Sequence, residues 1–204
     1  MREQVAARRR GEVDDTLLLV EHPPVITVGV EGDDGGAAAS GLEVVRVERG
    51  GHATYHGPGQ LVGYPIVDLE RRARDVRRFV RDLEAVLVEA LAGFGVAAGH
   101  LSGQPGVWVG GERKIASIGI AVDHWVTFHG FALNVDPDLA AFSRFRPCGL
   151  DGRRMTSIAR ELGRPVGLGE VRPRVVEAWL ARFSAPYVPT PPPPGSAPVA
   201  SARA

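Results

Sequence analysis

Residues 107–135, VWVGGERKIASIGIAVDHWVTFHGFALNV, contain three successive segments with the composition of β-strands. Residues 107–109 and 114–122 are mostly apolar, and the turn Gly110-Gly111-Glu112-Arg113 between them is typical of a β-hairpin. Residues 125–135 form a third predicted strand. Strands that are joined by short turns pair antiparallel, so this stretch predicts an antiparallel part of a β-sheet.

The segments on either side add further strands and several helices. Asp75 is a suitable N-cap for a helix whose apolar residues recur at helical spacing until Gly93, and shorter helices are expected at residues 157–162 and 170–183. The order of elements predicts an α+β domain with a mixed, largely antiparallel sheet and flanking helices. Upstream strands are expected at residues 16–20, 25–30, 42–47 and 61–69, with a glycine-rich loop at 50–59.

The composition narrows the class of protein. The 204 residues are 44% hydrophobic and carry 24 basic and 24 acidic side chains, which suffices for one globular core and argues against a nucleic-acid binder. A single cysteine excludes a disulfide framework and fits a reducing compartment. No apolar run approaches the ~18 residues that span a bilayer, and the N-terminus lacks the apolar segment of a secretory signal. We therefore expect a cytoplasmic protein that does not bind a membrane.

The last part of the chain differs from the rest. Seven of the 20 residues from 185 to 204 are proline, and most of the others are Ala, Ser or Thr. Such a segment cannot bury a core. We therefore expect a single domain over residues 1–184 and a proline-rich disordered tail over residues 185–204.

Two reactive side chains occur only once. Of the 24 basic residues 23 are arginine, so Lys114 is the only lysine, and Cys148 is the only thiol. Lys114 has the same strand parity as Ile118 and Ile120, which places it on an apolar face where desolvation suits an amine to act as a general base. The alternatives are a strand-end lysine that reaches solvent, or a lysine that survived the replacement of lysine by arginine in a GC-rich genome.

Cys148 lies between Pro147 and Gly149 in a predicted loop. A thiol in a loop is more accessible than one in a strand, and the Gly149 amide could stabilise an oxyanion beside the sulfur. Thiolate chemistry needs a partner that takes or stabilises the thiol proton, and Lys114 or a histidine could supply it. The alternative is a buried cysteine that only packs.

The densest polar cluster is the loop at residues 49–60, RGGHATYHGPGQ. His52 and His56 are four residues apart, but no carboxylate lies between them and no cysteine is near, so no metal site is predicted. The glycines of this loop favour a backbone that lines a substrate cleft. His124 and His129 are expected to be structural hydrogen-bonding residues. Six arginines between residues 71 and 81 are either a solvated helix face or a patch for an acidic partner.

Five blocks of the sequence resemble the lipoyl(octanoyl) transferases. The blocks are residues 16–24 (TLLLVEHPP), 49–65 (RGGHATYHGPGQLVGYP), 111–119 (GERKIASIG), 129–135 (HGFALNV) and 147–150 (PCGL). They follow one another in the order of that family over roughly residues 14–162. Five ordered blocks are far more specific than any one of them.

The resemblance implies an acyltransferase for the first step of protein lipoylation. Such an enzyme moves an octanoyl or lipoyl group from acyl carrier protein, through a thioester on Cys148, to a lysine of a lipoyl domain. Lys114 aligns with the lysine that activates the nucleophile. The implied acceptors are the E2 subunits of 2-oxoacid dehydrogenases and the glycine cleavage H protein. The enzyme is expected to act as a monomer in the cytoplasm, without a cofactor or a metal.

The resemblance also implies the fold and the binding residues. The fold is expected to be similar to the catalytic domain of biotin and lipoate protein ligases, with residues 1–184 as a single octanoyltransferase domain. The residues implied to line the acyl pocket are Arg49, Gly50, Gly51, His52, Ala53, Thr54, Tyr55, His56, Ser117, Ile118, Gly119, Gly130, Phe131 and Ala132.

Two departures from the family are visible. The first strand of the family has no counterpart before the match, so the domain is expected to be N-terminally short. Residues 30–34, VEGDD, are acidic where the family tends to carry a basic residue.

Two other functions compete with this interpretation. An ATP-dependent protein ligase of the lipoate or biotin type would consume ATP and would need no thiol. A non-catalytic module that binds lipoyl domains or acyl groups would form no covalent adduct.

Overall fold

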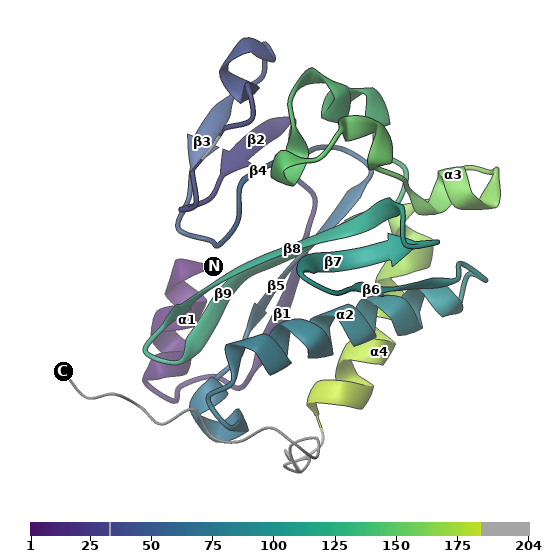
Figure 1. The fold of residues 1–204 in the computed structure, drawn as a ribbon. Helices are drawn as coiled ribbons and strands as arrows, with labels where there is room; N and C mark the ends of the chain where they lie inside the picture. The colour runs from purple at the N-terminus through teal and green to yellow at the C-terminus, as the bar shows by residue number, and fades with distance from the viewer. Residues whose placement is uncertain (33, 185–204) are drawn as a thin grey trace.

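The computed structural model describes residues 1–32 and 34–184, and its largest element is a six-stranded sheet (Figure 1). The order across the sheet is β1 (Thr16–Val20), β5 (Gln60–Ile66), β9 (Val126–Asn134), β8 (Arg113–Asp123), β7 (Gln104–Val109) and β6 (Ala98–Leu101). Every pair of neighbouring strands is antiparallel, which confirms the predicted fold class. The predicted hairpin joins β7 and β8. The proline-rich tail predicted at residues 185–204 lies outside the described residues, as does Asp33 of the acidic segment.

A smaller sheet lies at the upper left of Figure 1, with the order β3 (Val44–Arg46), β2 (Val25–Val28) and β4 (Ala53–His56). β2 pairs with β3 in parallel and with β4 antiparallel. Strand β4 falls inside the segment 50–59, so the prediction that this whole segment is a loop is wrong. Tyr55 on its own favours extended backbone. The strand forms, however, by pairing with β2, where the partner Ile26 is distant in the sequence, and local composition does not predict that pairing.

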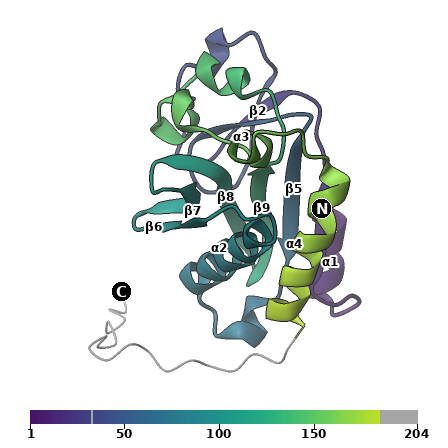
Figure 2. The ribbon, with the colours of Figure 1, turned by 90° about the vertical axis from the view of Figure 1, so that its right-hand side faces the viewer.

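Two long helices, α2 (Val76–Ala92) and α4 (Leu168–Phe183), contact each other and cover one face of the six-stranded sheet (Figure 2). Leu133 of β9 belongs to the same hydrophobic cluster as Leu87 of α2 and Val175 of α4. Side chains of a strand alternate between the two faces, so every second residue of the central strands points into this core.

The opposite face of the sheet is partly covered by α1 (Arg2–Arg9), which the sequence does not predict. Val5 of α1 is buried and packs with Ile66. Arg8 is also buried, and its Nε donates to Asp15 at 2.8 Å. A helix with one large apolar residue in eight has no amphipathic periodicity, so only the tertiary contacts of Val5 and Arg8 account for it.

The ends of the helices follow local signals. The Asp75 side chain accepts a hydrogen bond from the Arg78 N–H at 2.9 Å, so α2 begins where the sequence predicts. Helix α3 (Ile158–Leu162) ends at Gly163, whose φ is 65°. The strand predicted at residues 61–69 ends at residue 66 instead. The short 3₁₀ helices are η1 (Ala37–Ala39), η2 (Leu69–Arg72), η3 (Leu139–Arg144), η4 (Pro147–Gly149) and η5 (Gly152–Arg154).

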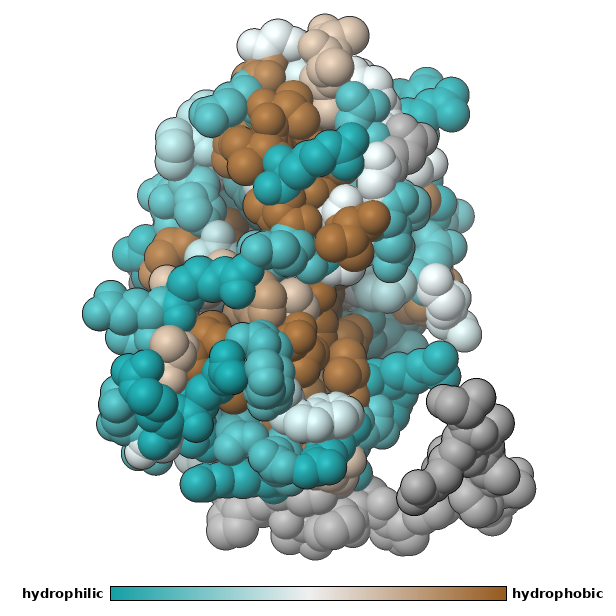
Figure 3. Space-filling view, turned by 90° about the vertical axis from the view of Figure 1, so that its left-hand side faces the viewer, coloured by the Kyte–Doolittle hydropathy of each residue, from teal (hydrophilic) through white to brown (hydrophobic). Residues whose placement is uncertain are grey.

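Figure 3 shows the face of the molecule that carries β3 and α1. Hydrophobic side chains gather in an upper and a lower region of this face, among hydrophilic ones. In the small sheet and the residues after β2, Val30, Val44 and Val45 are exposed. Within the described part of the chain, no helix is long and apolar enough to cross a bilayer.

Asp75→Ala tests the start of α2. Removing the carboxylate leaves the Arg78 N–H without its acceptor, and we expect the free energy of unfolding to fall by about 1 kcal/mol. Urea denaturation monitored by circular dichroism measures the change. Asp75→Asn keeps an oxygen acceptor and should lose much less. Equal stability of wild type and Asp75→Ala would contradict the capping role.

Candidate functional site

Strand β8 separates two cavities, because its side chains alternate between the two faces of the six-stranded sheet. The first cavity, of about 130 Å³, is lined by Ser117 and lies between this sheet and the small sheet. The second cavity, of about 390 Å³, lies on the face of α2, and Lys114 and Ile120 line it. The predicted common face of Lys114, Ile118 and Ile120 is confirmed. The residues that line both cavities are Gly50, Gly51, His52, Ile118 and Gly119.

The first cavity brings together twelve of the fourteen residues that the resemblance implies for the acyl pocket. The remaining two, Ala53 and Tyr55, do not line it. Both are buried in a separate hydrophobic cluster with Phe142, because alternate residues of β4 point to opposite sides. The twelve are Arg49, Gly50, Gly51, His52, Thr54, His56, Ser117, Ile118, Gly119, Gly130, Phe131 and Ala132.

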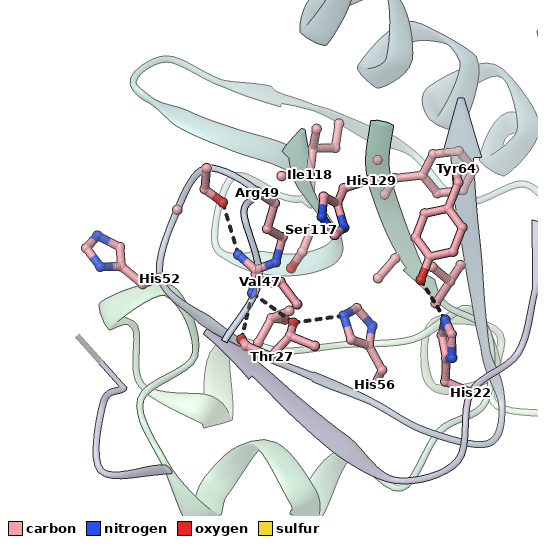
Figure 4. A pocket seen from close by; sticks show the side chains of 18 of the residues that line it. His22, Thr27, Val47, Arg49, His52, His56, Tyr64, Ser117, Ile118 and His129 are labelled. Carbon is pink, nitrogen blue, oxygen red and sulfur yellow. Dashed lines mark hydrogen bonds between the residues drawn. The ribbon is translucent and has the colours of Figure 1, made fainter. Parts of the chain in front are cut away.

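Arg49 is buried at the wall of the first cavity, with 7% of its surface exposed. One terminal nitrogen donates to Thr27 O at 2.7 Å and to Thr27 Oγ1 at 3.0 Å, and the other donates to Gly50 O at 3.0 Å (Figure 4). These bonds tie the segment after β3 to β2. Arg49 therefore fixes these two segments of the cavity wall relative to each other.

Three ring side chains that the sequence did not assign to the site also line the first cavity: His22, Tyr64 and His129 (Figure 4). His22 Nε2 and Tyr64 Oη are 2.6 Å apart. Burial lowers the pKa of both histidines and raises the pKa of Tyr64. The three rings are therefore uncharged near pH 7. His129, expected only as a structural residue, faces the cavity.

Strand alternation could have identified part of this missed set. Val62 and Tyr64 share the parity of β5 that faces the first cavity, and both stand in the second of the five sequence blocks. His22 lies in the turn before Pro23-Pro24, where no periodicity applies. The other lining residues that sequence reasoning missed are Val25, Thr27 and Val47.

His56 begins a buried chain of hydrogen bonds. Its Nδ1 lies 2.8 Å from Gln60 Oε1. The Gln60 Nε2 donates to Tyr55 O at 3.2 Å and to Asn134 Oδ1 at 2.9 Å, so Gln60 Oε1 is an acceptor and His56 Nδ1 carries the hydrogen. His56 Nε2 then accepts from the Thr27 hydroxyl at 3.3 Å. Burial lowers the pKa of His56 to about 4, which agrees with this neutral tautomer.

The series of hydrogen bonds continues to the segment before α3. Asn134 Nδ2 donates to Thr156 O at 2.9 Å, and Thr156 Oγ1 donates to Glu161 at 2.6 Å. Glu161 also accepts two hydrogen bonds of 2.9 Å from Arg113. The Thr156 N–H donates to Lys114 O at 3.0 Å. These hydrogen bonds thus fix the wall of the first cavity relative to the backbone of Lys114.

Lys114 is buried, with 4% of its surface exposed, and its Nζ lies 5.2 Å from the centre of the Trp108 ring. Gly106 makes room for it, because a Cβ at that position would lie 2.7 Å from Lys114 Cε and 2.4 Å from Ala116 O. The Gly106 N–H donates to the buried Glu84 carboxylate at 3.0 Å. The alternative interpretation of Lys114 as a strand-end lysine that reaches solvent is wrong.

The backbone of Cys148 lies in η4, and Leu150, two residues further on, lines the second cavity. The Cys148 side chain is outside the described part of the structure, so its pairing with Lys114 stays a prediction. Gly149 has a φ of 73°, and its N–H donates to Arg146 O at 3.2 Å. This amide is used within the turn, contrary to the expectation that it stabilises an oxyanion.

The two histidines of the 49–60 segment point in different directions (Figure 4). His56 joins the buried chain, whereas His52 lies at the rim with 43% of its side chain exposed, 3.9 Å from Glu31. Among residues 1–32 and 34–184, no group of three or more His, Cys, Asp or Glu side chains is placed to hold a metal ion.

Both the sequence and the fold are similar to those of known proteins. Residues 1–180 match the family described as Lipoyl protein ligase A/B catalytic domain. An octanoyltransferase of Citrifermentans bemidjiense is 51% identical over 175 residues, which cover 86% of this chain and 85% of that protein. The fold is similar to that of lipoate-protein ligase A bound with ATP, with a TM-score of 0.70 and 19% identity over 86% of this chain and 75% of that chain. A biotin protein ligase from Aquifex aeolicus, in complex with biotin and ATP, has a TM-score of 0.54 and 15% identity over 78% of this chain and 70% of its own. The expected similarity of fold is confirmed.

His56 makes the stability of the protein depend on pH. Its pKa is about 4 in the folded state and 6.5 as the ordinary value, so between these values the unfolded chain binds more protons and stability falls as the pH falls. At pH 5 this loss amounts to about 2 kcal/mol. We expect His56→Gln to lose about that much less stability between pH 7 and pH 5, measured by urea denaturation. Substituting the exposed His100 by Gln is the control. An unchanged pH dependence in His56→Gln would contradict the buried neutral histidine.

Gly106→Ala tests the space around Lys114. The new methyl group would meet Lys114 Cε and Ala116 O, and the φ of 124° is unfavourable for alanine, so we expect about 2–4 kcal/mol of destabilisation. Lys114 should also move outward and react faster with an amine-directed reagent, as peptide mapping can measure. Gly110→Ala is the control, since Gly110 has a φ of 61° but no atom within 4 Å of its Cβ position. Unchanged labelling in a folded Gly106→Ala variant would refute this role of Gly106.

Proposed function

The chain belongs to the octanoyltransferases of the lipoyl protein ligase A/B catalytic-domain family and transfers octanoyl groups in protein lipoylation, and from this premise we propose that Cys148 and Lys114 carry out the transfer in two steps. Cys148 is the nucleophile that carries the acyl group as a thioester. Lys114 takes up and returns the protons. The observation that carries this proposal is the buried Lys114 in a cavity that shares part of its lining with a second one.

In the first step Lys114 accepts the thiol proton of Cys148. The thiolate attacks the carbonyl carbon of the donor thioester, the new C–S bond forms, and the bond to the carrier sulfur breaks. The departing carrier thiolate recovers the proton from Lys114. One thioester replaces another, so the step is nearly balanced in energy and needs no ATP.

In the second step the neutral amine of the acceptor lysine attacks the Cys148 thioester. A C–N bond forms, the C–S bond breaks, and the proton lost by the amine passes through Lys114 to the Cys148 thiolate. The product is an amide, which is more stable than a thioester, so this step drives the reaction. The free enzyme is regenerated with its thiol and its amine.

The first cavity is the proposed site of the octanoyl chain. Twelve residues that the family resemblance implies for the acyl pocket line it, and the neutral His22, Tyr64 and His129 add no charge to the wall. Burial of an alkyl chain contributes about 0.8 kcal/mol for each CH₂. An alkyl chain that fills the cavity also keeps water from the thioester and so slows hydrolysis.

The proposed partners are octanoyl-acyl carrier protein as the donor and the lipoyl domains of 2-oxoacid dehydrogenase E2 subunits and of the glycine cleavage H protein as acceptors. We further propose that residues 1–184 act as one catalytic domain, as a monomer in the cytoplasm. The single thiol supports a reducing compartment, where Cys148 stays available for the reaction.

Intact-mass analysis after incubation with octanoyl-acyl carrier protein tests the mechanism. We expect one octanoyl group on the wild-type chain, none on Cys148→Ala, and no effect of adding ATP. Subsequent addition of a lipoyl domain should remove the group from the enzyme and place it on the domain. An adduct that persists in Cys148→Ala, or no adduct on the wild type, would contradict the thioester.

Lys114→Arg separates proton transfer from charge. Arginine keeps the positive charge but does not lose its proton near neutral pH, so we expect thioester formation to slow by about 10²-fold or more. Single-turnover mass spectrometry measures the rate. Exposed Arg172→Lys, a reciprocal change on α4, should leave the rate as it is. A fully active Lys114→Arg would refute the proton-transfer role.

A further inference from the structure

The second cavity is larger than the first and joins it at Gly50, Gly51, His52, Ile118 and Gly119. Lys114 lines it as a buried residue, whereas Glu31, Gly103 and Pro105 are exposed and stand at its rim. A substrate whose acyl chain fills the first cavity and whose reacting carbon lies near Lys114 must extend onward through this second space. The octanoyl chain alone leaves the second cavity without an occupant.

One stripe of α2 borders the second cavity. Val80 lines it, and Glu84, one turn further on, accepts from the Gly106 N–H beside Lys114. Arg77 and Arg81 lie three residues before and one residue after Val80, on the same side of the helix as Glu84. Neither arginine lines the cavity, but both are exposed on α2 within one helical turn of Val80.

These two arginines differ from the other four of the 71–81 segment. Arg77 and Arg81 are exposed and form no ion pair with any described residue. The other four each form an ion pair within the molecule, so the segment is not a uniform basic patch. Their pairs are Arg71 with Asp68, Arg72 with Asp15, Arg74 with Glu70 and Arg78 with Asp82.

We propose that the second cavity binds the phosphopantetheine arm of the donor thioester, with its phosphodiester at Arg77 and Arg81. This inference rests on the proposed function, since it names how that donor reaches the site. The sulfur end of the arm lies at Lys114. The phosphodiester carries the one fixed negative charge of the arm, and guanidinium groups bind such oxygens through charge-assisted hydrogen bonds.

The length of the phosphopantetheine arm and the lining of the second cavity are compatible. Arg77 and Glu84 are seven positions apart, which corresponds to about 10 Å along α2. The arm has ~13 bonds between sulfur and phosphorus and spans roughly 15 Å when extended. Its two amides need hydrogen-bonding groups along the way, and Gln104, whose side chain is an amide, lines the cavity. Four glycines of the wall add no side chain to this space: Gly50, Gly51, Gly103 and Gly119.

Three octanoyl thioesters test the proposal: those of 4′-phosphopantetheine, of pantetheine and of the much shorter N-acetylcysteamine. The measured quantity is kcat/KM for acylation of the enzyme, followed by intact mass and by thiol release. For the double variant Arg77→Gln/Arg81→Gln we expect the ratio of the phosphopantetheine to the pantetheine value to fall about tenfold. For Val80→Trp, which fills the cavity, the ratio of the pantetheine to the N-acetylcysteamine value should fall by a similar factor.

Arg172→Gln is the matched control, because Arg172 of α4 is also exposed, forms no ion pair with a described residue and does not line the second cavity. It should leave both ratios unchanged. Circular dichroism confirms that each variant is folded.

Ratios in the cavity variants that equal those of the wild type would overturn the proposal. So would a loss confined to the second step, the transfer from preformed acyl-enzyme to a lipoyl domain, because it would assign the cavity to the acceptor. Failure of the wild type to be acylated by any of the three thioesters would instead refute the proposed function itself.

Discussion

A buried chain of hydrogen bonds holds the two sheets and the site together. It runs from Thr27 of the small sheet through His56 and Gln60 to Asn134 and on to Thr156. A buried polar group that loses its partner costs about 1–3 kcal/mol, so each member constrains the next. Gln60 and Asn134 are also direct cross-strand partners of β5 and β9. A slip of one residue between these strands would break the chain and turn the core side chains to the wrong face.

The same constraint explains how β8 serves two cavities. The series of hydrogen bonds anchors the backbone of Lys114 through the Thr156 N–H, and Gly106 leaves space for the methylene groups of the lysine side chain. Alternation along β8 then places Ser117 toward the first cavity and Ile120 toward the larger second one. Under the proposed function and the inference drawn from it, the first cavity takes the acyl chain and the second the arm that delivers it. A single strand with two differently covered faces would then serve both.

Local signals predicted much of the fold. The hairpin of β7 and β8 follows from strand composition and a glycine turn, and α2 follows from its periodicity and its Asp75 cap. The failures share one cause. Strand β4 is stabilised by pairing with β2 and is hidden among glycines, and α1 is stabilised by the packing of Val5 and Arg8. Both elements depend on contacts with residues far away in the chain, which local composition does not record.

The amino-acid sequence alone identified the family, the α+β class, the single lysine and the single thiol, because residue types, spacing and ordered blocks are properties of the chain itself. It also named twelve residues that surround one cavity. The folded structure decided that Ala53 and Tyr55 face away from that cavity, and that His22, Tyr64 and His129 also line it. It also decided that, among the described residues, only two of the six clustered arginines lack an internal ion pair. Which face a side chain occupies depends on strand pairing, and which charge stays available depends on neighbours brought close by folding. Both are set by contacts between distant segments.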